Sequence, residues 1–562
     1  MALSSRNSAP RKSMTDPAFH DAPAVSPPVP LRSSASRVRW VALLCSLLAC
    51  VYYLAFQSHR LGFDALDYAY GVKRGHNLFH PHHLLYNAVG RALYVAVSAL
   101  HPVDALSLLA SQNAVVTAAS VGLLCLLLFR VTQRLSVSVG LCLLFAGLRG
   151  VTAMATSVEV YPATTLFELC AISLWLLRPV PSLGTLAAMG ICCGLCALFH
   201  QTGIFFVLAM AYGLWTQDRR PSRVLCFLAA AFAVCGGAYL YVGMVVEKRP
   251  LGGLWTWVTA YAHSDEYRLG MWGHGLRLQS LPSAAQGLFQ VITAPYYLEN
   301  LSRQFRPSVW DVVLSLSLLA SLGLWLSLLV TALRRPKGIA SHGAEDLANT
   351  HLAAQTLRPL LMLWIGLHSA FTLWWEPGNF EFWLLAAPPT VLLCGSLCRR
   401  PPNAKKQWQM SVALGLLFFG NFGLCTLPSH RGVDNPNAEI YRILSTQTVD
   451  SEDIYVGDFA TLQLYFLYYA DKRVPLHSLR FEGYSRPSQK AEVIDSYRAR
   501  IDNIRRQHRV FFLEHERFDQ YDAFDREDVE RLYAPMLIGA TEIGSYQKGA
   551  DTYRILRLAK LP

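Results

Sequence analysis

The sequence predicts a polytopic α-helical membrane protein, with about 11 transmembrane helices and a small extracytoplasmic α/β domain at the C-terminus. Two observations carry this prediction. Of the 562 residues, 53% are hydrophobic and only 16% are charged, which excludes both a disordered chain and an ordinary water-soluble enzyme. The charges are also unevenly spread, because residues 1–428 hold 31 basic and 17 acidic residues while residues 429–562 hold 19 and 21. The first part therefore has the composition of a membrane domain and the second that of a soluble one.

The net charge of +12 arises from the membrane part, so it indicates topology anchors rather than nucleic-acid binding. All thirteen cysteines lie in or beside apolar runs, and residues 429–562 contain none, which excludes a disulfide framework there. Cys192, Cys193 and Cys196 lack a neighbouring histidine or carboxylate at ligand spacing. We interpret them as small packing residues of a membrane helix.

The N-terminal residues 1–36 are rich in Ser, Pro and Ala and are interpreted as a disordered cytoplasmic tail. Residues 37–428 form the predicted transmembrane domain, with outer loops at 57–103 and 247–307. The first span, Val38–Phe56, follows several arginines, and the positive-inside rule places its N-terminus in the cytoplasm.

Ten further apolar runs complete the eleven predicted spans. They are residues 104–129, 135–156, 160–177, 183–199, 203–216, 224–246, 308–333, 357–375, 380–398 and 408–428. Basic clusters fall on alternate connections between them, around Arg130, Arg178, Arg219, Arg334 and Arg399, as the positive-inside rule requires. This agreement requires that His82–Leu100 does not span, and we interpret it as an amphipathic helix at the outer interface. The protein is thus expected in the plasma (inner) membrane, with the C-terminal domain 429–562 outside.

The C-terminal domain shows short apolar runs typical of buried strands at Asp453–Gly457, Arg509–Leu513 and Thr552–Leu558. Helical patterns lie at residues 460–471 and 490–507. These alternating patterns predict a small α/β domain.

Four connections assigned to the outer face carry polar residues of the types that serve in catalysis or substrate binding. The first outer loop contains Asp64 and Asp67, which share one face of a helix and suit a base with its partner or a divalent cation. The other three are the segment with Glu159 and Tyr161, the break with His200 and Gln201, and the aromatic patch with Glu376 and Glu381. Each of these four segments, taken alone, has a purely structural interpretation as a solvated loop, a helical turn or an interface belt. Their shared side of the membrane favours one extracytoplasmic cavity.

These residues resemble a known family. Asp64-Ala65-Leu66-Asp67 followed by His80-Pro81-His82-His83-Leu84-Leu85-Tyr86 looks like the Asp-x-x-Glu and His-Pro-Pro pattern of protein O-mannosyltransferase-like members of the GT-C glycosyltransferases. Glu159-Val160-Tyr161 resembles their Glu-Val-Tyr motif, and Leu198-Phe199-His200-Gln201-Thr202 resembles a later His-containing motif. The resemblance covers roughly residues 38–400.

The resemblance implies an inverting transfer of a sugar from a polyprenyl-phosphate donor to an acceptor hydroxyl on the extracytoplasmic face. Asp64 is implied as the general base, with Asp67 as its partner. The residues implied to bind substrate are His80, His83, Glu159, Tyr161, His200, Gln201, Glu376 and Glu381. The cations proposed for the donor phosphate are Lys73, Arg74 and Arg268, with Arg303 and Arg306 as further candidates. No metal or other cofactor is required by the sequence, although the acidic pair leaves a divalent cation open.

The expected partners are the polyprenyl-phosphate-linked sugar, a protein or glycolipid acceptor and the bilayer, with no nucleic acid. Two other classes of function stay open. A secondary transporter is expected to show an internal repeat with broken helices at the membrane midplane, and no such repeat is visible. A non-catalytic lipid-binding membrane protein does not require the acidic and histidine residues to converge.

Overall fold

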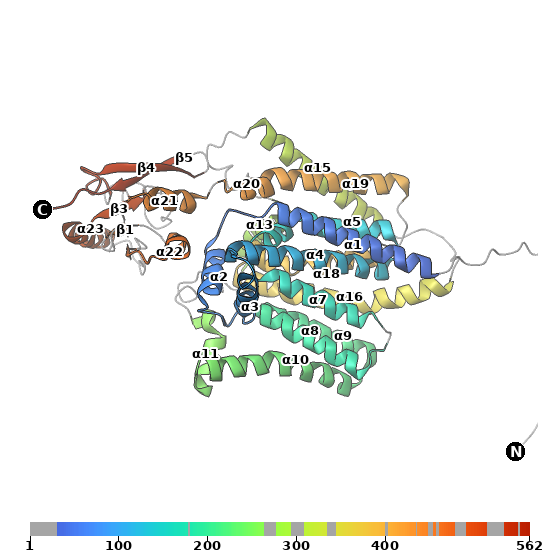
Figure 1. The fold of residues 1–562 in the computed structure, drawn as a ribbon. Coiled ribbons are helices and arrows are strands. Elements are labelled where there is room, and N and C mark those ends of the chain that lie inside the picture. Colours follow the sequence, from blue (N-terminus) through green and yellow to red (C-terminus); the bar gives the residue numbers. More distant parts are fainter. Residues whose placement is uncertain are drawn as a thin grey trace, which may run out of the picture.

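The fold is described from a computed structural model of the chain. The structure describes residues 31–177, 180–263, 277–293, 308–333, 344–398, 403–433, 435–447, 453–456, 460–477, 490–513, 533–548 and 551–562. Most of them form a helical bundle, and a smaller unit of sheet and helices lies beyond one end of it (Figure 1). The predicted helical architecture with a small C-terminal α/β unit is confirmed.

Most helices of the bundle run along it between its two ends, and a few are short (Figure 1). Its helices are α1 (Leu31–Ala55), α4 (Ala105–Thr132), α5 (Leu135–Gly147), α6 (Arg149–Thr156), α7 (Tyr161–Trp175), α8 (Leu183–Phe199), α9 (Ile204–Asp218), α10 (Pro221–Tyr241), α15 (Val309–Leu333), α16 (Ala344–Trp375), α17 (Phe380–Leu384), α18 (Ala387–Leu397) and α19 (Ala404–Asn421). A helix lies at each of the eleven predicted runs. Helix α1 begins at Leu31, inside the range predicted as a disordered tail, and residues 1–30 lie outside the described part of the chain.

Fewer helices qualify as membrane spans, judged by length and composition, than the eleven that the sequence predicts. Within the described ranges, six helices are long and apolar enough to cross a membrane, or seven if the bent pair α5 and α6 counts as one span. That pair bends by 62° at Leu148. Helices α7, α8 and α9 have 15, 17 and 15 residues, fewer than the roughly 20 that a bilayer core requires. The count of about eleven is therefore not confirmed.

The shorter elements gather mainly near the ends of the bundle. They are α2 (Phe63–Arg74), α3 (Tyr86–Ser98), α11 (Leu251–Val258), α13 (Leu281–Ile292), α20 (Leu427–His430) and α21 (Pro436–Ser445), with the single turns η1 (Gln201–Gly203), η2 (Val242–Val246), η3 (Ala260–His263), η4 (Leu278–Ser280) and η5 (Phe422–Thr426). Helix α3 covers most of the stretch predicted to lie at the interface, and its 13 residues are too few to span. Helix α2 ends at Gly75, whose φ of +74° is the left-handed conformation that favours glycine at a helix end.

Two contacts show that predicted cytoplasmic connections share one end of the bundle. The Arg130 guanidinium donates to the carbonyl of Leu176 (2.7 Å), and that of Arg134 donates to the carbonyl of Cys398 (3.2 Å). Helix α2 lies at the opposite end, which we call the α2 end (Figure 1). The assignment of these ends to the two sides of a membrane stays a prediction.

The C-terminal unit contains one five-stranded sheet of order β2-β1-β3-β5-β4. Its strands are β1 (Ile454–Val456), β2 (Leu476–His477), β3 (Val510–Leu513), β4 (Thr541–Lys548) and β5 (Asp551–Arg557), with α22 (Ala460–Tyr465), η6 (Phe466–Ala470) and α23 (Lys490–Gln507) between them. Strand β1 pairs in parallel with β2 and β3, whereas β5 is antiparallel to both β3 and β4. The three predicted strands and both predicted helices are present.

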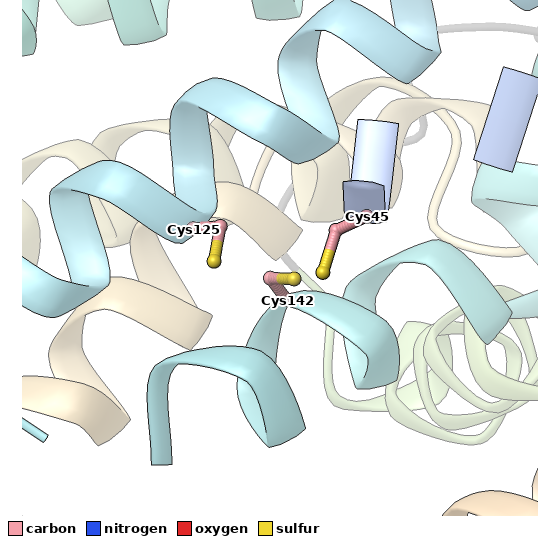
Figure 2. Close-up of side chains that lie close together, drawn as sticks. All are labelled: Cys45, Cys125 and Cys142. Atoms are coloured by element: carbon pink, nitrogen blue, oxygen red, sulfur yellow. The ribbon is translucent and has the colours of Figure 1, made fainter. Parts of the chain in front are cut away.

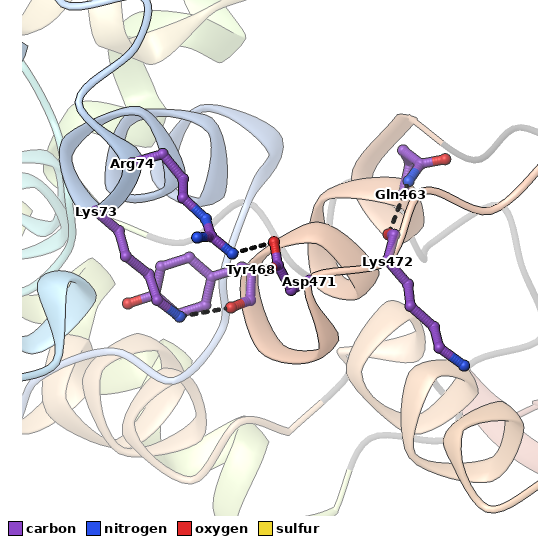
Figure 3. A network of polar contacts seen from close by, with 6 residues as sticks. All are labelled: Lys73, Arg74, Gln463, Tyr468, Asp471 and Lys472. Atoms are coloured by element: carbon purple, nitrogen blue, oxygen red, sulfur yellow. Dashed lines mark hydrogen bonds and ion pairs between the residues drawn. The ribbon is translucent and has the colours of Figure 1, made fainter.

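The C-terminal unit is joined to the α2 end by polar contacts (Figure 3). The Lys73 ammonium donates to the carbonyl of Tyr468 (2.8 Å) and lies 4.6 Å from the centre of its ring. Arg74 forms an ion pair with Asp471. The Tyr468 hydroxyl donates to Asp104 (2.6 Å), the residue that caps the N-terminus of α4. The unit and the first loop thus lie on the same side of the bundle.

Candidate active site

Helix α2 presents the two predicted catalytic carboxylates. Asp64 lies in the first turn of α2, and Asp67 follows three residues later on the same face. The Asp64 side chain keeps an exposed surface, yet the protein around it removes part of its hydration. This desolvation raises the pKa of Asp64 above its usual value, and the carboxylate of Asp67 raises it further. Asp64 is therefore a reachable carboxylate whose affinity for a proton is increased.

Glu159 approaches Asp64 from the connection between α6 and α7. The bend at Leu148 directs α6 toward this connection, and Asn113 of α4 holds it by donating to the carbonyls of Ser157 (2.9 Å) and Glu159 (2.7 Å). Burial raises the pKa of the Glu159 carboxyl well above its usual value, and the carboxylates of Glu381 and Asp64 raise it further. Three acidic groups from separate parts of the chain therefore share one site.

Glu376 and Glu381 flank the start of α17. The Asn379 side chain accepts from the backbone N–H of Glu381 (3.0 Å) and donates to the Glu376 carboxylate (3.3 Å), so one residue orders both acids. The positive charge of Arg149 acts on Glu381. The Arg149 guanidinium also covers the ring of Phe380 at 4.4 Å and donates to the carbonyl of Gln290 (2.9 Å).

The charge of Arg149 acts on this acidic group, although the sequence motifs assign this residue no role. Its signal in the sequence is an arginine inside an apolar run, a pattern that marks functional sites in membrane proteins. Glu168, a buried acidic residue in another apolar run, has a different environment, because its carboxyl group contacts the thiol of Cys196 (Sγ–Oε1 3.8 Å).

The imidazoles of the first loop form a cluster beside this acidic group. The rings of His80 and His83 stack with their centres 4.6 Å apart, and His83 also meets the ring of Tyr68 at 4.7 Å. The ring of His82 lies 3.5 Å from that of Tyr261, which follows α11 in the large loop. Within the described residues, Nδ1 of His80, Nε2 of His82 and both nitrogens of His83 have no hydrogen-bond partner although they are buried.

Burial keeps these rings neutral near pH 7. It lowers the pKa of His80 and lowers that of His83 well below its usual value, and it lowers the pKa of His82 to about 2, helped by the neighbouring imidazoles. A neutral imidazole offers one N–H donor and one acceptor nitrogen. The cluster is therefore suited to hydroxyl groups, which both donate and accept.

The break between α8 and α9 places His200 and Gln201 next to the same loop. The His200 ring packs on Tyr161 at 4.7 Å between ring centres, and its Nδ1 lies 2.7 Å from the Thr202 hydroxyl. The Gln201 amide donates to the carbonyls of Pro81 and Val258, both at 2.9 Å. The Gln201 nitrogen thus holds the histidine loop and α11 in place, a structural use that the sequence did not indicate.

The cations proposed for the donor phosphate are placed differently from the acids. Lys73 and Arg74 stand at the far end of α2 and contact the C-terminal unit (Figure 3). Arg268 lies outside the described residues, as do Arg303 and Arg306. The phosphate-binding role of all these residues stays a prediction.

The acidic and imidazole groups do not form a compact metal site in the described part of the chain. In that part, Cys45, Cys125 and Cys142 are the one group of three such residues whose ligand atoms all lie within 4.8 Å of one another, and the group includes none of these carboxylates or imidazoles.

Comparisons with known proteins give one kind of match. No family model and no curated relative matches the chain. Among solved structures, ArnT from Cupriavidus metallidurans covers 94% of this chain and 98% of its own (13% identity, TM-score 0.37). The oligosaccharyltransferase AglB from Archaeoglobus fulgidus, in complex with an inhibitory peptide and a dolichol-phosphate, covers 86% and 69% (13%, 0.42). The Pmt1-Pmt2 O-mannosyltransferase of S. cerevisiae, bound to the sugar donor, covers 36% and 32% (15%, 0.31).

All three matches are GT-C glycosyltransferases, the class that the order of the sequence motifs predicts. The match spans about a third of the yeast chain's own length. At these identities and TM-scores the similarity assigns no activity to this chain.

Proposed function

We propose that this protein is a membrane glycosyltransferase that moves a hexosyl, mannose-like sugar from a polyprenyl-phosphate donor to an acceptor hydroxyl. The observation that carries the proposal is the convergence of Asp64, Glu159 and Glu381 beside a cluster of neutral imidazoles at the α2 end. A site at the end of the bundle, built on connections between helices, differs from the midplane site on broken helices that is typical of a secondary transporter.

Asp64 is the proposed general base. It removes the proton of the acceptor hydroxyl while that oxygen attacks the anomeric carbon, and the bond from this carbon to the lipid phosphate breaks. Attack opposite the phosphate inverts the configuration of the sugar. Two features of Asp64 suit this role, since its side chain is exposed and its raised pKa increases its affinity for the proton.

The remaining groups are proposed to hold the sugar. The neutral rings of His80 and His83 are matched to hydroxyls, and the acids Asp67, Glu159, Glu376 and Glu381 accept from hydroxyl groups. His200 and Tyr161, whose rings pack together, are proposed to contact the sugar as well, and Gln201 contacts the histidine loop. No metal or other cofactor is part of the proposal.

The lipid phosphate leaves as an anion and needs a cation more than an acid. Arg149 is the described cation whose charge acts on this acidic group, while Lys73, Arg74 and Arg268 are the candidates from the sequence. The acceptor is proposed to be a protein or glycolipid that reaches the α2 end from the extracytoplasmic side, where the C-terminal unit contacts α2.

The direct test is transfer by the purified full-length protein in lipid nanodiscs. Radiolabelled polyprenyl-phosphate sugars are supplied with an extract of envelope proteins and glycolipids, and label in the acceptor and release of polyprenyl phosphate are measured together. Transfer that requires Asp64 supports the proposal. Binding of the donor with no release of polyprenyl phosphate for any sugar would indicate a lipid-binding protein, and label accumulated inside sealed vesicles would indicate a transporter.

The pH dependence of sugar transfer is expected to reveal the electrostatic coupling between the carboxylates of Asp64 and Asp67. A base acts only when ionised, so the rate is expected to fall as the pH drops through the raised pKa of Asp64. Replacing Asp67 with Asn removes a negative charge that disfavours ionisation of Asp64, so the acidic limb should move to lower pH. Desolvation, the larger cause of the raised pKa of Asp64, remains in this variant, so the shift is expected to be partial.

This shift is measured as the midpoint of the acidic limb of kcat/KM against pH. The matched control is Asp218→Asn, at the other end of α9 from the site, where Asp218 pairs with Arg220 and Arg223. An acidic limb with the same midpoint in the Asp67 variant would contradict the coupling of the two carboxylates.

A further inference from the structure

Three cysteine side chains meet inside the bundle, away from the proposed active site. Cys45 of α1, Cys125 of α4 and Cys142 of α5 point toward one another, with all three sulfur atoms within 4.8 Å (Figure 2). Cys45 is 5% exposed and the other two are fully buried. Among the residues that the structure describes, this is the one group of three His, Cys, Asp or Glu side chains with ligand atoms this close.

Close helix packing next to the thiols fixes their positions. A Cβ at Gly122, one turn before Cys125, would lie 3.0 Å from the Cβ of Ser46 and 3.2 Å from the carbonyl of Ala42, so α1 and α4 need glycine here to come this near. The Ser46 hydroxyl donates to the carbonyl of Ala118 (2.7 Å).

The third helix is tied to the first by a separate contact. The Tyr53 hydroxyl of α1 donates to the carbonyl of Ala146 in α5 (2.9 Å), one turn after Cys142. The three backbones are thus positioned by contacts that do not involve sulfur. The thiols are held together by the fold, which is the pre-organisation that a ligand site requires.

The sulfur triangle has the size of a three-coordinate metal site. Metal–thiolate bonds of about 2.3 Å place the three sulfurs of a planar site roughly 4 Å apart. The three sulfur atoms lie within 4.8 Å of one another, so they reach this spacing with small side-chain movements. The surroundings are apolar, because Ala42, Val121, Leu141 and Phe145 belong to the same buried core.

The donor set selects the kind of metal. Zinc in structural sites is almost always four-coordinate, and no fourth such ligand joins the group in the described residues. Calcium and magnesium take oxygen ligands, whereas soft sulfur ligands select Cu(I). A monovalent ion also adds the least charge to an apolar interior.

We propose that Cys45, Cys125 and Cys142 form a binding site for a soft, thiophilic monovalent ion, Cu(I), which cross-links α1, α4 and α5. Because the thiolate is the form of cysteine that ligates metals, Cu⁺ binds as S–H bonds are replaced by Cu–S bonds, and one H⁺ is released for each thiolate formed. No electron is transferred, because the ion enters in its reduced state.

The test uses the purified full-length protein, reduced and metal-free, in competition with a chromogenic Cu(I) chelator. The wild type is expected to withhold one equivalent of Cu(I) per chain. The triple variant Cys45→Ala, Cys125→Ala, Cys142→Ala should lose this equivalent. The matched control replaces Cys170, Cys192 and Cys193 of α7 and α8 with Ala and should retain it.

The X-ray absorption spectrum of the wild type with one equivalent of Cu(I) is the second measurement, and it requires no variant. It should show three sulfur neighbours at about 2.3 Å. Equal retention of Cu(I) by the wild type and a folded triple variant would overturn the proposal and leave the thiols as packing residues. Should the triple variant fail to fold, a spectrum with nitrogen or oxygen neighbours, or with fewer than three sulfurs, would overturn it.

Discussion

Replacing Asp64 with Asn is expected to lower the rate of sugar transfer by about 10²–10⁴-fold, the contribution of one well-placed base. Asn has nearly the same shape as Asp but cannot accept the proton of the acceptor hydroxyl. The effect is expected on kcat, because donor binding depends on other groups. No hydrogen bond among the described residues uses the Asp64 carboxylate, and its side chain is exposed, so the fold should persist.

The measurement is transfer from the labelled lipid-linked donor at saturating donor and acceptor, with yield and melting temperature as checks on folding. Asp218→Asn is again the control, since α9 separates Asp218 from the site by about 15 residues, roughly 20 Å of helix. Asp64→Glu should recover part of the activity because it restores a carboxylate. A rate for Asp64→Asn equal to that of the wild type would remove Asp64 as the base.

The apolar runs in the sequence predicted the positions of the helices more accurately than the number of membrane spans. Each run became a helix because a continuous apolar segment can bury itself only among other apolar segments or lipid. The run at residues 135–156 became two helices joined at a 62° bend, and α7 and α9 are 15 residues each. Bends and short helices depend on neighbouring helices, so the sequence pattern of one run does not reveal them.

The C-terminal sheet was only partly visible in the sequence. Strands β1 and β3 are fully buried and read as apolar runs. Strand β4 mixes polar residues with Gly544, where the pairing with β5 shifts register. A Cβ at Gly544 would lie 2.8 Å from the Ile443 side chain, so this glycine permits the close contact with α21. Such a bulged edge strand carries no alternating apolar pattern.

The candidate site shows the same limit for residues whose partners are distant in sequence. Lys73 and Arg74 are predicted phosphate ligands, and the sequence did not indicate that Lys73 also contacts a residue 395 positions later. Gln201 contacts a loop 120 positions earlier. By contrast, the predicted topology places the Asp64, Glu159 and His200 motifs on one side of the membrane, and in the structure the charge of Asp64 acts on Glu159.

The removal of one hydroxyl, in Tyr468→Phe, is expected to loosen α2 and to slow transfer. The Tyr468 hydroxyl donates to the Asp104 carboxylate (2.6 Å) and accepts from the backbone N–H of Leu106 (3.1 Å), while its carbonyl accepts from Lys73 (2.8 Å). The tyrosine therefore links the N-terminus of α4 to the end of the helix that carries Asp64. A hydrogen bond to a charged group contributes about 1.5–3 kcal/mol, so the docked state of the C-terminal unit should weaken roughly 10–100-fold relative to the undocked state.

Hydrogen–deuterium exchange in α2, α4 and α22 measures the docking directly, and steady-state transfer measures its consequence. Exchange at α2 should rise and kcat should fall, while the midpoint of the acidic limb of kcat/KM stays at its wild-type pH, because Tyr468 acts through the position of α2 and not through the charge of Asp64. The matched control is Tyr469→Phe, since the neighbouring Tyr469 is 52% exposed and its ring only packs against other tyrosines. Unchanged exchange at α2 in Tyr468→Phe would show that the C-terminal unit does not hold this helix. A fall in kcat without increased exchange would instead place the Tyr468 hydroxyl in contact with substrate.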